Sequence, residues 1–195
     1  MRNKTNRAVS IKIAALIAAI VLFIGCTAGG TVAWLVSKPK PIVNVFTVGN
    51  INAELAETKK EFKIVPGVNI TKDPVATVKA NSEECYLFVK LTEENWPAFT
   101  EADNTTRKVE YKIADGWTKL EDGVYYREVP KKDTDQAFHV LQNDKVTVSN
   151  TLTKENADAI QKAGAPELTV AVYAVQKEGM GSAADAWETA KAKEN

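Results

Sequence analysis

Few side chains in this sequence are of the types that carry out catalysis. His139 is the only histidine among the 195 residues, and it stands between Phe138 and Val140 in a strand-like run. No His-Glu-x-x-His stretch occurs, so the sequence lacks the ligands of a zincin-type protease. The glycine spacing matches neither a phosphate-binding loop nor a dinucleotide-binding motif. We therefore predict that the protein is not an enzyme, that it has no catalytic residue and no cofactor, and that His139 is structural.

Neighbouring acidic residues could in principle bind a cation. None of them lies in an EF-hand pattern, and we interpret them as solvated turns: Glu83-Glu84, Glu93-Glu94 and Glu121-Asp122. We assign no metal-binding residue, although a weak calcium or surface-metal site among these acids stays open. Four aromatic residues could line a glycan platform, but packing is the favoured role for Trp96, Trp117, Tyr125 and Tyr126.

Two cysteines are present, Cys26 and Cys85. Cys26 falls within a candidate export signal, so a cleaved product keeps only Cys85 and has no internal disulfide. Because Cys85 is followed by Tyr86 and Leu87 in a strand-like run, we predict a small, buried, apolar side chain. An intermolecular disulfide, a reactive thiol and a pair with His139 are the alternatives.

The first 33 residues have the pattern of a secretory signal peptide. A basic segment, residues 1–12, precedes an apolar segment, residues 13–25, which we expect to form a hydrophobic signal helix. Small residues then offer peptidase sites after Ala28 and after Ala33. We favour cleavage after Ala33, which makes Trp34 the new N-terminus and predicts a secreted protein of the extracellular matrix or cell surface.

Two alternatives to cleavage and release stay open. Apolar character continues to Val36, which is long enough for an uncleaved membrane anchor, and residues 23–26 resemble a lipoprotein cleavage box. In the first case the uncleaved leader is the only contact with a membrane. Residues 1–33 carry four basic side chains and no acidic one, so the remainder has four more acidic than basic side chains. This mild acidity argues against a nucleic-acid partner.

Beyond the leader the sequence predicts an extended segment, residues 34–48, and a β domain, residues 49–195. Pro39 and Pro41 have no N–H group to donate, so they cannot lie in a central strand. Residues 51–57 alternate between apolar and polar, which is the period of a half-buried strand. Residues 85–92 are almost continuously apolar and β-favouring, so we expect them at the centre of a sheet with both faces covered. Short strands punctuated by turns favour an antiparallel β-sandwich of jelly-roll type.

Turn residues predict how some of these strands connect. Asp115-Gly116 and Asp122-Gly123 separate short strands, and Asp-Gly between alternating runs is a strong hairpin signal. Residues 137–141 and 145–149 are expected to pair around the three residues between them.

Two helices complete the prediction. Residues 153–163 are expected to form a short helix that ends at Gly164. Residues 182–191 are expected to form a terminal helix that docks Trp187, with Asp185 reaching back to the first free N–H groups.

Several segments resemble the TasA/camelysin family. Residues 29–34 (GGTVAW) close the apolar segment, and residues 44–49 (NVFTVG) lead into an alternating strand. Further similarity lies in PG at 66–67, TKDP at 71–74, CYLFV at 85–89, AVQ at 174–176 and SAADAW at 182–187. Members of this family are exported by Gram-positive bacteria and are processed by a signal peptidase of the SipW type.

The resemblance implies a jelly-roll body that polymerises into biofilm-matrix fibres. The freed N-terminal strand of one subunit would complete the sheet of the next, by donor-strand complementation. Carried over here, Ala33 and Trp34 flank the cleaved bond, residues 34–48 are the donor, and its interface residues are Trp34, Leu35, Val36, Ile42, Val43 and Val45. The implied partners are further copies of this chain in head-to-tail order, the signal peptidase, and a second matrix or anchor protein.

This sequence departs from the family pattern at Pro39 and Pro41, which shorten the strand that can pair. Camelysin-type members have also been grouped with metallopeptidases, an activity that the absent zinc motif does not support. Two other interpretations stay open. Residues 34–48 could lie on their own domain as an edge strand, and the protein could be a monomeric secreted module that binds a wall polymer or host ligand.

Overall fold

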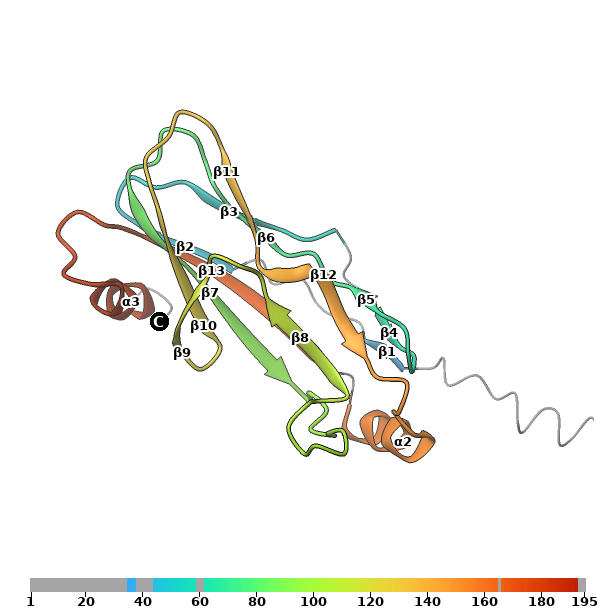
Figure 1. Cartoon of the computed structure of the whole chain (residues 1–195). Helices are drawn as coiled ribbons and strands as arrows, with labels where there is room; N and C mark the ends of the chain where they lie inside the picture. The colour runs from blue at the N-terminus through green and yellow to red at the C-terminus, as the bar shows by residue number, and fades with distance from the viewer. Residues whose placement is uncertain (1–34, 38–43, 59–61, 165, 193–195) are drawn as a thin grey trace, which may run out of the picture. The chain divides into compact units, whose positions relative to one another are not determined.

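The structure is a computed structural model that describes residues 35–37, 44–58, 62–164 and 166–192. The chain divides into two units, Met1–Val32 and Ala33–Asn195. The first unit, and with it the expected signal helix, lies outside the described residues. The second unit is mainly β with two short helices in its described part (Figure 1). The prediction of a mainly β fold is therefore confirmed.

The strands of the described residues are numbered along the chain. They are β1 (Leu35–Ser37), β2 (Asn44–Val48), β3 (Ala53–Ala56), β4 (Phe62–Ile64), β5 (Ile70–Thr71), β6 (Val75–Val78), β7 (Cys85–Glu94), β8 (Val109–Ile113), β9 (Thr118–Glu121), β10 (Val124–Val129), β11 (Gln136–His139), β12 (Leu141–Val148) and β13 (Glu167–Gln176). The helices are α2 (Lys154–Ala163) and α3 (Ala183–Lys191).

The largest sheet has five strands in the order β2-β13-β7-β10-β9. β13 and β7 pair antiparallel along their whole length, from Glu167 opposite Glu94 to Gln176 opposite Cys85. β10 pairs antiparallel with the other edge of β7. The predicted run at residues 85–92 therefore lies in the middle strand of the sheet, as expected.

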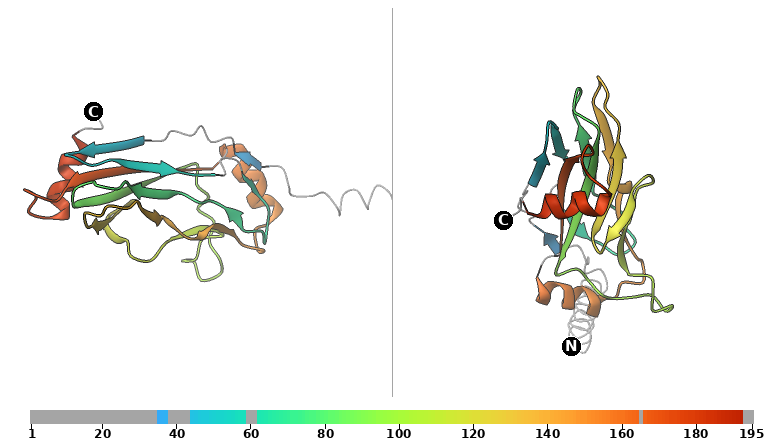
Figure 2. Two further views of the ribbon diagram at one scale, coloured as in Figure 1. Left: turned by 90° about the horizontal axis from the view of Figure 1, so that it is seen from above. Right: turned by 90° about the vertical axis from the view of Figure 1, so that its left-hand side faces the viewer.

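A second layer is built from two three-stranded sheets, β11-β6-β3 and β5-β12-β8. The two sheets follow one another along the same strands, because β5 leads into β6 and β11 leads into β12. Val140 N donates to Pro74 O, and Lys72 N donates to Asp144 O, which joins the two sheets across the junction. The two layers lie face to face in a sandwich-like arrangement (Figure 2).

Strand alternation places the core on both faces of β7 and β13. Cys85, Leu87 and Val89 face the second layer together with alternate residues of β13. Tyr86 and Phe88 point to the opposite face, where they pack with Tyr173 and α3. Both faces of the central strands are thus covered, which explains their nearly continuous apolar sequence.

The terminal helix α3 begins and docks as predicted. Ser182 is its N-cap and accepts a hydrogen bond from Asp185 N. Asp185 contributes differently from the prediction, because its carboxylate accepts from the Ser182 hydroxyl at 2.8 Å. Trp187, 2% exposed, lies against the outer face of the five-stranded sheet.

The other helix, α2, is also as predicted. Thr153 and Asn156 form a reciprocal capping box, and the helix ends at Gly164. Ile160 packs with Val146, Val148 and Leu152 at one end of the second layer. Because α2 immediately precedes β13 and α3 follows it, the two helices lie at opposite ends of the sandwich, called here the α2 end and the α3 end (Figure 1).

Only one of the two Asp-Gly turns closes a hairpin. β9 and β10 pair around Asp122-Gly123, where a Cβ on Gly123 would lie 2.6 Å from Leu91 O. The strands on either side of Asp115-Gly116 belong to different layers, because β8 pairs with β12 and β9 with β10. The hairpin prediction was wrong at Asp115-Gly116, where the turn carries the chain from one layer to the other.

The predicted pairing of residues 137–141 with 145–149 is also wrong. Those residues form β11 and β12, which run on from each other and pair with different neighbours. Asn143 and Asp144 have positive φ angles, 55° and 51°, and the register of β12 against β8 shifts there. The turn-forming residues make an irregularity within β12, which pairs with β5 and β8, while β11 pairs with β6.

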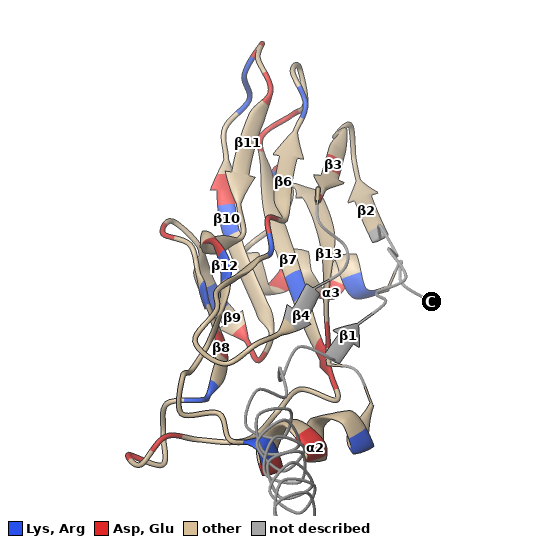
Figure 3. Ribbon diagram, turned by 90° about the vertical axis from the view of Figure 1, so that its right-hand side faces the viewer, with Lys and Arg blue, Asp and Glu red and all other residues tan. Residues whose placement is uncertain are grey.

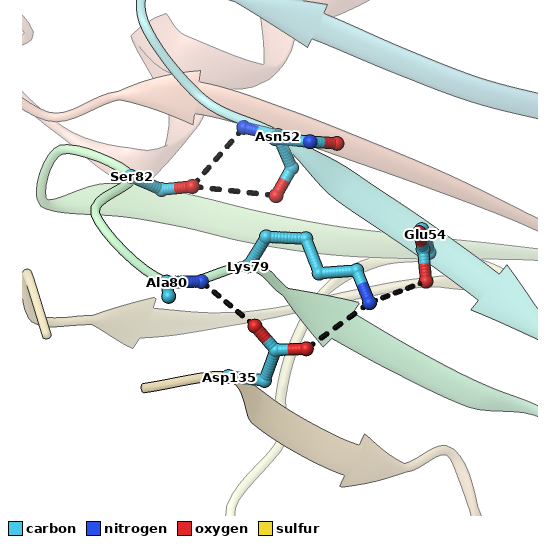
Figure 4. A network of polar contacts seen from close by, with 6 residues as sticks. All are labelled: Asn52, Glu54, Lys79, Ala80, Ser82 and Asp135. Carbon is cyan, nitrogen blue, oxygen red and sulfur yellow. Dashed lines mark hydrogen bonds and ion pairs between the residues drawn. The ribbon is translucent and has the colours of Figure 1, made fainter. Parts of the chain in front are cut away.

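Polar contacts hold the loops at the α3 end (Figure 4). Lys79 Nζ lies 2.8 Å from Glu54 Oε2 and 3.1 Å from Asp135 Oδ2. The hydrogen bonds to both carboxylates raise the pKa of Lys79. Ser82 Oγ accepts from Asn52 N and donates to Asn52 O. These contacts tie β3, the turn before β7 and the segment before β11 to one another.

Candidate functional site

The N-terminal strands β1 and β2 are the part of the described chain to which the sequence assigned a function. β2 pairs parallel with β13, with Asn44 opposite Ala171 and Val48 opposite Val175. All other strand pairs of the described residues are antiparallel. β2 closes one edge of the five-stranded sheet, and no described strand pairs with its outer side.

Three side chains anchor β2 in its own sheet. Val45 packs against the core between the layers. Phe46 stacks on Tyr173 with ring centroids 4.8 Å apart and planes 13° apart. Val48 joins the cluster beneath α3, and Tyr173 meets Trp187 edge to face at 4.9 Å. Both faces of β2 are thus in contact with the body of the domain.

β1 belongs to a different sheet. Among the described strands it pairs antiparallel with β4, Leu35 opposite Ile64 and Val36 opposite Lys63, in a two-stranded sheet. Ile64 of β4 packs in the core cluster that includes Ile70, Val146 and Val148. Trp34, Ile42, Val43 and the cleavage residue Ala33 lie outside the described residues. Of the six predicted interface residues, the structure places Leu35 and Val36 in β1 and Val45 in β2.

The sequence prediction missed the aromatic contacts that fasten β2. Phe46, Tyr173 and Trp187 form a continuous series from the edge strand to the terminal helix. A signal was present, because Phe46 is the one aromatic residue among residues 42–48. Its partner could not be read from the sequence, since Tyr173 comes more than 100 residues later.

The residues that the sequence offered for catalysis or ligand binding do not lie together in one site. His139 is exposed and its Nδ1 lies 2.8 Å from Asp144 Oδ1, whereas Cys85 is fully buried in the core between the layers. Tyr125 and Tyr126 face opposite sides of the sheet, so they cannot belong to one glycan platform with Trp96 and Trp117. Within the described ranges, no group of three or more His, Cys, Asp or Glu side chains is arranged to hold a metal ion.

The neighbouring acidic residues are mostly engaged in ion pairs on the surface. Glu83 pairs with Lys131, Glu84 with Lys177, Glu93 with Arg107 and Asp122 with Lys119.

No helix in the described part of the chain has the length and apolar character needed to cross a membrane.

The buried Cys85 gives a first testable expectation. Burial raises the pKa of its thiol to about 12, so almost no thiolate is present at pH 8. In a protein that begins at residue 34, where Cys85 is the only cysteine, we expect no reaction with Ellman's reagent until denaturant is added. The absorbance of the released thiolate measures this, and rapid labelling of the folded protein would contradict the observed burial.

Fold and site together define a class of protein: a mainly β, sandwich-like domain whose N-terminal strands lie at sheet edges. Comparisons with protein-family models, with curated proteins and with solved structures found no match to this chain. They therefore add no support to the resemblance noted in the sequence, which stays a proposal.

Proposed function

We propose that this chain is an exported structural protein whose copies assemble head to tail into extracellular fibres of a biofilm matrix or cell surface. In this proposal the sandwich-like body is a jelly roll, the chain is a member of the TasA/camelysin family, and a SipW-type peptidase frees the N-terminal segment. The observation that carries the proposal is that β1 and β2, the first two strands of the described chain, both lie at the edges of the sheets to which they belong.

The anchoring of β2 suggests which part acts as the donor. β2 is fastened through Val45 and Phe46, so it stays with its own sheet. Residues 34–43 precede it and include β1. The proposed donor is therefore the part of the 34–48 segment upstream of β2.

Elementary sheet chemistry explains why such a segment would bind a second copy. An open edge has unpaired N–H and C=O groups that an incoming strand satisfies, while alternate side chains fill pockets. The contact joins different surfaces of the two copies, so its repetition gives a filament.

Charged residues of both signs are interspersed on α2 (Figure 3), and Lys154 and Asp158 of this helix form an ion pair. The described residues of α2 therefore carry no concentrated charge of one sign.

Electron microscopy and size-exclusion chromatography of the protein that begins at Trp34 test the proposal. We expect fibres from this protein and soluble, folded monomers from one that begins at Asn44. Undiminished fibre growth by the shorter protein would refute the donor role. A variant with Ser37→Thr, Lys38→Arg and Lys40→Arg, which keeps every apolar donor residue, is the control and should still form fibres.

A further inference from the structure

We propose that a hollow at the α3 end receives the free N-terminus of a second copy, with the Trp34 side chain against its apolar wall and the Trp34 α-ammonium group beside Glu178. This inference rests on the head-to-tail assembly proposed above. It identifies the residues that recognise the incoming chain.

The hollow lies where the parallel strands β2 and β13 both end. It has a volume of about 320 Å³ and is lined by Val48, Gly49, Val175, Gln176, Gly179 and Met180, with Glu178 at the same site. This volume lies at the lower end of the roughly 300–1,000 Å³ typical of ligand pockets. Val48, Val175 and Met180 supply apolar surface from β2, from β13 and from the loop before α3. The hollow thus suits one aromatic side chain.

Two glycines border the hollow, and a Cβ built on Gly49 would lie 2.6 Å from Gln176 Oε1. Gly49 and Gly179 have positive φ angles of 95° and 83°, a conformation that residues with side chains rarely adopt. A Cβ built on Gly179 would meet no atom within 4 Å. The space beside Met180 is therefore free for a group from outside the domain.

The charges around the hollow favour a cation. Lys177 is already engaged, with its Nζ 2.8 Å from Glu84 Oε1 and 2.6 Å from Glu128 Oε2. Glu178 accepts a hydrogen bond from Gln176 Nε2 at 3.3 Å and has no ion-pair partner among the described residues. An α-ammonium group on a chain that enters the hollow would supply one, in the manner of known amine-capture sites.

The length of the donor limits which part of a neighbour it can reach. Residues 34–43 span at most about 33 Å when fully extended. β2 starts opposite Ala171, four residues inside the start of β13. In the proposed assembly the donor continues the line of β2, so about 14 Å of its reach is needed to pass the start of β13, and about 20 Å is left for contact with a second copy. This length reaches the facing end of the next copy, where at most about six donor residues could pair with an open edge.

When copies stack head to tail along their strands, the α2 end of one copy faces the α3 end of the next. The reach of the donor therefore brings its tip to the end that carries the hollow. It follows that processing and assembly are coupled, because only cleavage after Ala33 gives Trp34 an α-ammonium group.

Fibre growth of the protein that begins at Trp34, followed by light scattering, tests this inference. Met180→Glu places a charge in the apolar wall and should slow growth by about tenfold or more, the effect of losing one buried contact of an interface. Met180→Leu conserves the apolar volume and is the matched control, which should grow at the wild-type rate. Glu178→Gln should slow growth by at most about fivefold, because an exposed ion pair contributes little. A protein that keeps Ala33 as its first residue should form fibres more slowly than the protein that begins at Trp34. The decrease in growth rate should be at least as large as that caused by Glu178→Gln.

A photo-crosslinking residue at position 34 gives an independent readout. In fibres grown from mixed isotope-labelled and unlabelled protein, we expect crosslinks between copies that map to the loop before α3. Normal growth of Met180→Glu together with crosslinks elsewhere would overturn this inference and leave the assembly proposal intact. Absence of fibres from the unmodified protein would overturn both. Thermal unfolding of each variant checks that it folds.

Discussion

Replacing Trp187 by alanine is expected to lower the free energy of unfolding by about 3–5 kcal/mol. The side chain is 2% exposed and lies between the helix and the sheet. Its ring centroid is 4.9 Å from that of Tyr173 and 5.4 Å from that of Phe88, and its Nε1 donates to Glu121 Oε1 at 2.7 Å. Truncation would leave a cavity between α3 and the strands that it covers. Urea unfolding followed by circular dichroism measures the change.

Two variants separate packing from other effects. Trp187→Phe keeps a large ring but loses the donor to Glu121, and we expect a loss of about 1–2 kcal/mol. Glu188→Ala changes the exposed neighbour on the same helix and should alter stability by less than about 0.5 kcal/mol. A loss under 1 kcal/mol for Trp187→Ala would mean that α3 does not pack on the sheet as described.

Glutamine in place of Glu57 is expected to destabilise the domain by about 2–4 kcal/mol, since it leaves a buried lysine without a countercharge. Lys72 is 3% exposed, and its Nζ lies 2.7 Å from Glu57 Oε1. That oxygen is itself buried and accepts no hydrogen bond from another described residue. The pair links the residue after β3 to the residue after β5.

The double variant Glu57→Gln with Lys72→Met gives the control, because it removes both charges. We expect it to recover most of the lost stability, and a double-mutant cycle then isolates the coupling between the two charges. The exposed pair of Lys154 and Asp158 offers a comparison, and Asp158→Asn should cost less than about 0.5 kcal/mol. Equal effects of Glu57→Gln and Asp158→Asn would contradict the burial of Lys72.

The two helices and the central strand could be predicted because their signals are local. Ser182 and Thr153 satisfy free N–H groups of helices that begin within a few residues of them. The continuous apolar run of β7 indicates burial on both faces without any information about its neighbours. In each case the residues that carry the signal are the residues that form the element.

The candidate site was predictable only in part. The leader pattern and the apolar residues that follow it can be read from the sequence, so the proposed donor segment could be named in advance. The hollow at the α3 end could not, because it combines Val48 and Gly49 with residues 175–180. Neither segment has a binding motif, and the hollow forms only where the two segments meet.

The sequence alone therefore indicated the mainly β fold, the two short helices and the central strand. Only the tertiary structure decided which strands pair. Asp115-Gly116 and Asp122-Gly123 are the same dipeptide, yet one crosses between layers and the other closes a hairpin. Likewise, nothing near Phe46 indicates that β2 lies parallel to β13. Strand pairing depends on contacts between residues far apart in the chain. The residues of one strand therefore do not indicate which other strand forms hydrogen bonds with its edge.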